Sequence, residues 1–255
     1  MKALLSHLAD KVQGAVRAYG GNFEEKVGTG AYGMSTSAID KLAEETVLDE
    51  LDRLGEKINV LSEEAGFVER GGDLTLVLDP VDGTHNAERG VPFYSTSLAV
   101  GKDSMAGTIH GLVRDLVAGR TYYASKGRGA FMDDVRLRVR KFNDKDALFC
   151  VYMGMNADEK ACSVAKSARR VRIFGAASLD MCMVASGASD VYYMNSTAKR
   201  AELRVVDIAA SALILREAGG DVVDLDRRTL DLPFDTKTTS NLIAYGDARV
   251  LEMIP

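Results

Sequence analysis

Apolar residues near the start of the chain recur at the spacing of a helix with one buried face: Leu4, Leu5, Leu8, Val12 and Val16. A second helix is predicted to begin at Ser37, which has the spacing of a capping box with Asp40, and to end at Gly55. Between these helices, residues 27–36 are rich in glycine and show no periodicity, so we expect a flexible loop there.

The rest of the chain changes character near residue 143. Short apolar runs at 58–61 and 74–78 predict buried strands, and β-type segments from Ser95 to about Arg140 predict a mostly antiparallel sheet. Beyond Asp144, strands and helices alternate, which is typical of an α/β lobe. We expect strands there at 148–152, 171–174, 191–194, 221–223 and 242–244, with helices from 157, through 181 and over 206–218. The chain is therefore divided into an N-terminal α+β lobe, residues 1–143, and a C-terminal α/β lobe, residues 144–255, that share one continuous body.

The composition of the 255-residue chain limits its chemistry. Hydrophobic residues make up 46%, enough for a sizeable core, and the net charge of -5 argues against a nucleic-acid binder. No apolar stretch is long enough to span a membrane, and the first ten residues are too polar for a signal peptide. Three cysteines without CxxC spacing favour the cytoplasm, and three scattered histidines argue against zinc. Any metal should then be held by carboxylates, which favours Mg²⁺ or Mn²⁺.

The segment that follows the 74–78 strand carries two close carboxylates. Asp79 and Asp82 flank a turn in which Pro80 fixes one φ angle and Gly83 allows a tight bend. The two side chains can converge on one point with the Val81 carbonyl between them, and hard cations prefer such oxygen ligands. Asp-Pro and Asp-Gly are also ordinary turn dipeptides, so a simple capped turn is the alternative. An EF-hand is excluded because Val81, Gly83 and Gly90 stand where acidic or amide ligands are needed.

Two further acidic segments belong to the same hypothesis. Glu63 and Glu64 follow the preceding strand and could face Asp79, whereas Asp207 opens a predicted helix, where an aspartate is more often a cap.

Residues 28–33 satisfy GxGxxG, but the segment before them is charged and is no hydrophobic strand, which argues against a dinucleotide site.

Taken together, these segments resemble the inositol monophosphatase-like family of metal-dependent phosphatases, which includes fructose-1,6-bisphosphatases. Residues 79–86 match its Asp-Pro-Ile/Val-Asp-Gly-Thr-x-Asn signature, and Glu63-Glu64 and 207–210 match its other acidic motifs. Segments 175–182 and 217–220 are also family-like, and the closest likeness is to the archaeal subgroup with dual activity. The resemblance implies an α+β fold, a layered αβαβα sandwich with a mainly antiparallel N-terminal sheet and a mixed C-terminal sheet, and a homodimer.

The resemblance also implies a ligand set and a mechanism. Glu63, Asp79 and the Val81 carbonyl would bind one Mg²⁺, and Asp79, Asp82 and Asp207 a second, with Mn²⁺ as a substitute. Glu63 and Thr84 would orient and deprotonate a metal-activated water for in-line attack on phosphorus, and Asp40 would support them. The substrate contacts would be Asp82, Gly83, Thr84, Arg172, Ala177 and Arg200.

We therefore expect a Mg²⁺-dependent phosphomonoesterase that hydrolyses inositol monophosphate, fructose 1,6-bisphosphate or both. A phosphatase of 3′-phosphoadenosine phosphate or NADP(H) is the alternative on the same metal core, and a non-catalytic metal- or phosphate-binding protein is the alternative of another class. Tyr32 stands where archaeal relatives usually have aspartate, which leaves a third metal ion open. His85, inside the central motif, has no assigned role.

Overall fold

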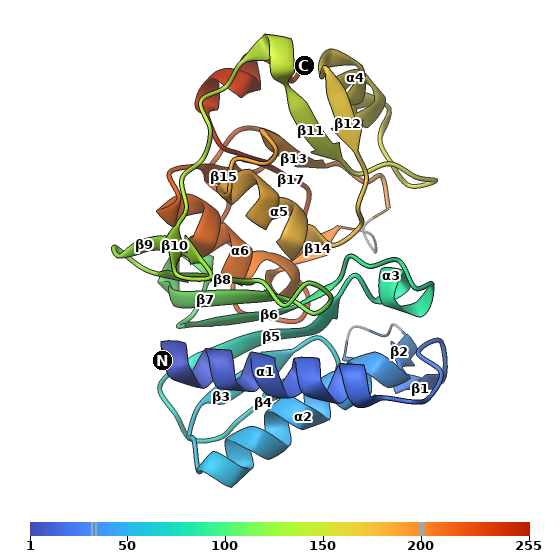
Figure 1. Cartoon of the computed structure of the whole chain (residues 1–255), viewed down its shortest axis with the longest axis vertical. Helices are drawn as coiled ribbons and strands as arrows, with labels where there is room; N and C mark the ends of the chain where they lie inside the picture. The colour runs from blue at the N-terminus through green and yellow to red at the C-terminus, as the bar shows by residue number, and fades with distance from the viewer. Residues whose placement is uncertain (32, 34, 199–201) are drawn as a thin grey trace.

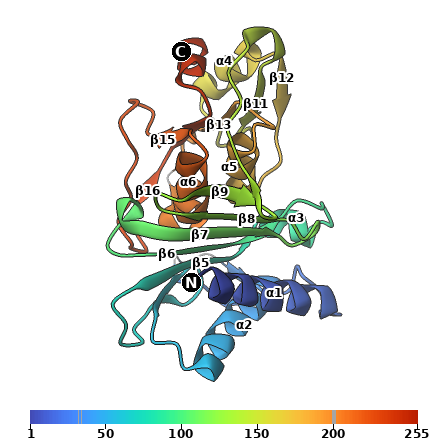
Figure 2. The same ribbon diagram turned by 60° about the vertical axis from the view of Figure 1, so that its left-hand side comes forward.

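The helices and sheets of the protein stack in five layers. The computed structural model describes residues 1–31, 33, 35–198 and 202–255. From one end to the other, the layers are a helix pair, an eight-stranded sheet, a second helix pair, a five-stranded sheet and an outer helical layer (Figure 1). The same order is seen after rotation by 60° (Figure 2). The expected αβαβα sandwich is confirmed.

The first layer consists of α1 (Lys2–Ala18) and α2 (Ala38–Leu54), as the apolar spacing predicts. The backbone N–H of Asp40 donates to the Ser37 hydroxyl at 3.3 Å, so Ser37 is the N-cap of α2. Gly55 ends α2 in the left-handed conformation, with φ of 67°. Both helix ends were therefore readable from local sequence.

The segment between these helices differs from the prediction. Instead of a loop without structure, β1 (Lys26–Thr29) and β2 (Ser35–Ser37) form an antiparallel hairpin. All of β1 is exposed, so the strand has no buried face and produces no alternation of apolar and polar residues. The prediction of a loop over 27–36 was therefore wrong for the strand residues.

The eight-stranded sheet has the order β10-β9-β8-β7-β6-β5-β3-β4. Its neighbours pair antiparallel except β3 and β5, which are parallel. Its strands are β3 (Asn59–Ser62), β4 (Gly66–Val68), β5 (Thr75–Asp82), β6 (Ser95–Gly101), β7 (Thr108–Asp115), β8 (Thr121–Ser125), β9 (Gly129–Met132) and β10 (Val135–Arg136). The expected end of a strand at Leu78 is corrected: β5 continues to Asp82, because pairing with β6 resumes after an irregularity between Asp79 and Asp82.

The second helix pair and the five-stranded sheet complete the core. The mixed sheet has the order β12-β11-β13-β17-β15, in which β11 pairs parallel with β12 and β13 and the remaining pairs are antiparallel. The elements are β11 (Leu148–Val151), β12 (Arg170–Arg172), α5 (Ala177–Ala185), β13 (Val191–Met194), α6 (Val205–Glu217), β15 (Asp221–Val223) and β17 (Leu242–Tyr245).

The helix α6 lies between the two sheets and packs against both. It contacts β6 and β7 on one side and β15 on the other. At Gly111 in β7 an added Cβ would lie 2.7 Å from the Ala210 carbonyl oxygen, so a side chain there would push α6 away. One apolar cluster includes residues of both sheets and of α6. The division into lobes 1–143 and 144–255 stays a prediction, because the sheets follow that boundary while the core crosses it.

The remaining elements are short or peripheral. They are α3 (Thr84–Glu88), η1 (Met105–Gly107), η2 (Asp144–Asp146), α4 (Glu159–Ser167), β14 (Leu203–Arg204), β16 (Thr239–Ser240) and η4 (Ala248–Met253). The outer layer is formed by α4 and η4, which cover an apolar cluster on the far face of the five-stranded sheet. Among the described residues, no helix has both the length and the apolar character needed to cross a bilayer.

Candidate active site

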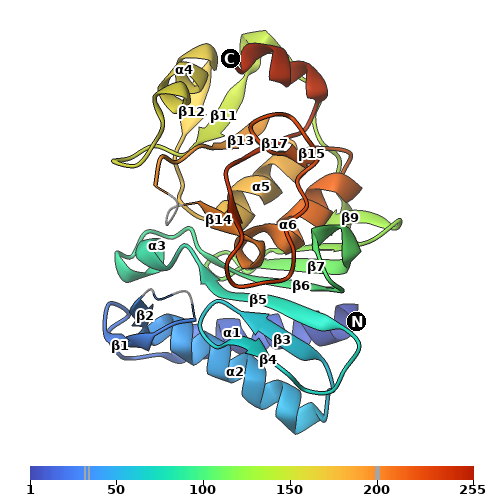
Figure 3. The ribbon, with the colours of Figure 1, turned by 180° about the vertical axis from the view of Figure 1, so that it is seen from behind.

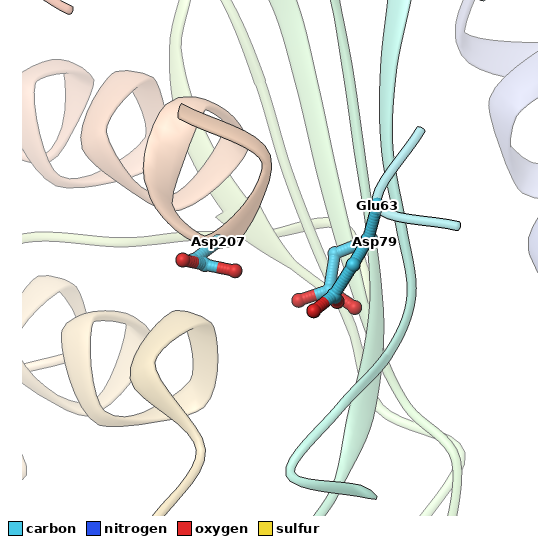
Figure 4. Close-up of side chains that lie close together, drawn as sticks. All are labelled: Glu63, Asp79 and Asp207. Carbon is cyan, nitrogen blue, oxygen red and sulfur yellow. The ribbon is translucent and has the colours of Figure 1, made fainter. Parts of the chain in front are cut away.

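Three carboxylates from separate elements converge at one end of the eight-stranded sheet. Glu63, Asp79 and Asp207 each offer an oxygen, and these three oxygens lie within 4.8 Å of one another. Figure 4 shows Asp207 at the start of α6, facing Glu63 and Asp79 across a short gap.

Strand register explains why Glu63 and Asp79 meet. In the parallel pair β3–β5, Ser62 lies opposite Leu78, and the Glu63 backbone N–H donates to the Leu78 carbonyl at 3.3 Å. Glu63 and Asp79 therefore each stand one residue beyond the same register position, which places them side by side although β5 continues to Asp82.

Asp207 is fixed by the first turn of α6. The backbone N–H of Arg204, the N-cap residue, donates to Asp207 Oδ2 at 2.6 Å, in a capping box. Because α6 is packed between the sheets, this turn is held against the end of β5. The capping role that the sequence suggested for Asp207 and its place in the acidic cluster therefore occur together.

The three carboxylates fit a divalent cation. Asp79 is 2% exposed, and its Oδ1 has no hydrogen-bond partner among the residues described. Burial, with the neighbouring carboxylates Glu63 and Asp82, raises the pKa of Asp79 well above its usual range. Burial likewise raises the pKa of Glu63 to about 8, although Arg204 acts in the opposite direction. A hard cation bound here would supply a partner for Asp79 Oδ1 and offset the repulsion among the acids.

Asp82 lies beside this cluster and is held by the N-terminus of α5. Its Oδ1 accepts from the Ala177 backbone N–H at 3.0 Å, and its Oδ2 accepts from the Ser178 backbone N–H at 2.7 Å. Burial still raises the pKa of Asp82 to about 6, despite these donors. The structure thus links Asp82 to Ala177, two residues that the resemblance assigned to the same site, although Asp82 is not one of the three closest carboxylates.

Gly83 and Thr84 connect this cluster to α2. Gly83 has φ of 86°, and an added Cβ would lie 3.0 Å from the Ala176 Cβ, so the turn requires glycine. The Thr84 hydroxyl lies 2.9 Å from Asp40 Oδ1 and 2.8 Å from the Val81 carbonyl oxygen. One hydroxyl proton can serve only one of these acceptors well. Asp40 is itself buried, and burial raises its pKa.

A cavity of about 280 Å³ lies over these groups. Its walls are Glu63, Asp79, Val81, Asp82, Gly83, Thr84, Tyr152, Gly175, Ala177, Tyr192, Met194, Glu202, Leu203, Arg204 and Asp207. Arg172 is exposed and lines a smaller neighbouring cavity of about 30 Å³, so it is not brought to the carboxylates. Arg200 and Tyr32 lie outside the described residues.

His85 and Glu64 point to other partners. The His85 ring is exposed and its Nδ1 lies 3.0 Å from Glu88 Oε2 on the same short helix. The Glu88 side chain is largely buried, and neither residue lines the cavity. Glu64 accepts a hydrogen bond from the Thr36 hydroxyl, and its backbone carbonyl accepts from the Ala31 N–H at 2.8 Å. The second glutamate of the pair therefore ties the β1–β2 hairpin to the end of β3.

Arg204 is the residue of this site whose role the sequence did not suggest. Its side chain is 17% exposed, and Nη2 lies 2.5 Å from Glu63 Oε1 and 3.1 Å from Asp207 Oδ1. Several arginines lie in this part of the sequence, and residue type alone does not distinguish Arg204 from them. The spacing of three residues before Asp207, at a helix start, was the only local signal.

The fold agrees with comparisons to known proteins. The model of the inositol monophosphatase family matches residues 3–252, and the chain belongs to that family. A fructose-1,6-bisphosphatase/inositol-1-monophosphatase of Thermococcus kodakarensis is 34% identical, over 90% of this chain and 85% of that protein. A crystal structure of an inositol monophosphatase–fructose 1,6-bisphosphatase superimposes with a TM-score of 0.88 at 29% identity, covering 99% of this chain and 97% of that one. A bifunctional NADP phosphatase/NAD kinase of Methanococcus maripaludis is 33% identical over 88% of this chain but 43% of its own length.

Proposed function

We propose that the protein is a Mg²⁺-dependent phosphomonoesterase that hydrolyses inositol monophosphate, fructose 1,6-bisphosphate or both. The observation that carries this proposal is the convergence of Glu63, Asp79 and Asp207 on a cavity of about 280 Å³, where Asp79 Oδ1 has no hydrogen-bond partner among the described residues. Family membership and a relative named for both activities support the same reaction.

In this proposal, two ions share the acidic residues. Glu63, Asp79 and the Val81 carbonyl would hold one, and Asp79, Asp82 and Asp207 the other, with Mn²⁺ able to replace Mg²⁺. When bound, such ions make water a stronger nucleophile and neutralise charge that develops on phosphoryl oxygens. A third ion is left open, because Tyr32 stands where the resemblance leads us to expect aspartate.

The chain's own residues would orient the reactants. If Thr84 donates its proton to Asp40, the Thr84 oxygen is left to accept a hydrogen bond from the attacking water, and Glu63 would take the water's proton. The new bond from water to phosphorus forms as the bond to the leaving alkoxide breaks. Asp82 and the amides of Gly83 and Thr84 would contact the phosphate, and Ala177 the rest of the substrate. Arg172 would need to turn from the neighbouring cavity to touch it, and Arg200 is proposed from the motif alone.

Phosphate release from a panel of substrates tests this function. Inositol 1-phosphate, fructose 1,6-bisphosphate, 3′-phosphoadenosine 5′-phosphate and NADP⁺ are each incubated with Mg²⁺, with Mn²⁺ and with a chelator. Release from one or both of the first two, lost on chelation, is expected. Release from NADP⁺ alone would favour the alternative that the bifunctional NADP phosphatase relative supports. Metal binding without release from any substrate would instead favour a non-catalytic binding protein.

We also propose that the enzyme is a homodimer in the cytoplasm. Light scattering after gel filtration measures the mass of the assembly and tests the dimer directly. A mass near that of the 27.5 kDa chain would contradict the dimer.

A further inference from the structure

The guanidinium group of Arg204 lies against two of the three converging carboxylates. Its Nη2 contacts Glu63 Oε1 at 2.5 Å and Asp207 Oδ1 at 3.1 Å, while Nε lies 3.3 Å from Asp207 Oδ2. Arg204 is the last residue of β14 and the N-cap of α6, so it lies on the same side of the cluster as Asp207. Figure 3 shows β14 beside the start of α6. A positive charge therefore already occupies part of the space where Glu63 and Asp207 meet.

The contacts divide into a backbone part and a side-chain part. The Arg204 backbone N–H donates to Asp207 Oδ2 at 2.6 Å, and a change of the Arg204 side chain leaves this bond at the start of α6 in place. The guanidinium adds two further contacts to Asp207 and the bridge to Glu63, which directly follows β3 of the eight-stranded sheet. Because this bridge joins two acids that otherwise repel each other, its main electrostatic effect is to neutralise the cluster.

A metal ion and this bridge draw on the same carboxylate group, that of Glu63. Glu63 Oε1 accepts from Arg204, and a cation placed among the three acids would draw on the carboxylate oxygens that converge there. A guanidinium and a divalent ion also repel each other strongly at such short range. The arginine and the ion therefore compete for Glu63.

We propose that Arg204 acts as an internal counter-ion: it neutralises Glu63 and Asp207 in the metal-free protein and releases Glu63 when metal binds. In this role Arg204 is a positioning residue that weakens the affinity for metal and stabilises the protein without it. The inference rests on the proposed function, because it assumes that the acidic cluster is a metal site.

Calorimetric titration of chelator-treated protein with Mg²⁺ and with Mn²⁺ tests the competition. The Arg204→Gln variant removes the charge and should bind metal about tenfold more tightly, which corresponds to about 1.4 kcal/mol. The Arg204→Lys variant keeps the charge but loses the planar fork that bridges two acids, so its affinity should be intermediate. This second variant serves if the glutamine variant does not fold.

Thermal unfolding separates a counter-ion from a purely structural arginine. Arg204→Gln should lower the melting temperature of the metal-free protein, and saturating metal should close most of the gap to the wild type. The matched control is Arg140→Gln, because Arg140 also bridges two aspartates, Asp146 and Asp190, and none of these three lines the cavity. The control should lose the same stability with and without metal and keep the wild-type affinity for metal.

The outcomes distinguish this inference from the function on which it rests. If the wild type binds metal but Arg204→Gln binds with equal or lower affinity, the counter-ion role is wrong while the proposed function stands. Equal losses of melting temperature with and without metal would overturn it as well, and so would a change of metal affinity in Arg140→Gln. If the wild type binds no metal, both the proposed function and this inference fail.

Discussion

Replacing the buried carboxyl group of Asp180 with an amide should stabilise the metal-free protein at neutral pH. Asp180 lies in the first turn of α5, is 2% exposed, and its Oδ1 has no hydrogen-bond partner within the described part of the chain. Burial raises the pKa of Asp180 from 3.8 to about 8, and the charge of Asp82 adds to the effect. The folded protein therefore keeps this group protonated at pH values where the unfolded chain ionises it.

The sign and size of the effect follow from the raised pKa. The contribution of protonated Asp180 to the free energy of unfolding is fully present below about pH 4 and is lost as the pH rises toward 8. In this pH range only the unfolded chain is stabilised by ionisation of the group. Each tenfold change in the ionisation equilibrium is worth about 1.4 kcal/mol, so the loss at pH 7 is at most about 4 kcal/mol. Asparagine has nearly the same shape and no charge. Asp180→Asn should recover about 1–3 kcal/mol of this loss after the cost of burying an amide.

Urea unfolding in the presence of a chelator measures the effect. The free energy of unfolding of Asp180→Asn minus that of the wild type should be small near pH 5 and grow as the pH approaches 8. The control is Asp146→Asn, because hydrogen bonds from Arg140 and Arg170 lower the pKa of exposed Asp146. Removing the charge of Asp146 should therefore destabilise the folded protein at neutral pH. A difference for Asp180→Asn that stays constant or shrinks with rising pH would refute the reasoning.

Three other substitutions test the site and its support. Gly83→Ala should lower the free energy of unfolding by about 1–3 kcal/mol, because φ is 86° and the methyl group would meet Ala176. An unchanged thermal midpoint would contradict this. Gly111→Ala should destabilise by about 3 kcal/mol in urea, since its Cβ would lie 2.7 Å from the Ala210 oxygen, and wild-type stability would show that α6 can move away. Asp82→Asn should lower kcat for phosphate release at least about a hundredfold in folded protein. Wild-type turnover would remove Asp82 from the ligand set.

The sequence predicts well those features that depend on residues adjacent along the chain. Ser37 and Gly55 mark the ends of α2 because capping and left-handed turns are set by a few adjacent residues. The converging acids were found through motif spacing, and register explains their meeting: Glu63 and Asp79 follow paired positions of parallel strands.

Features that depend on packing between layers could not be read in this way. The spacing of Arg204 before Asp207 is a local signal for that one contact, but it does not predict the bridge to Glu63. No local pattern predicts that Asp180 is buried. The continuation of β5 to Asp82 depends on pairing with β6, which the Asp-Pro turn signal conceals. The β1–β2 hairpin lacks a buried face and hence a pattern.

The position of α6 between the sheets makes this protein suitable for fragment complementation. A cut after residue 143 would leave Glu63 and Asp79 on one fragment and Asp207 on the other, so neither piece would hold the complete set of acids. The set would be restored only when α6 docks on β7, where Gly111 permits the close approach. Recovery of metal affinity would then report the reassembly of the two halves, as a split enzyme does.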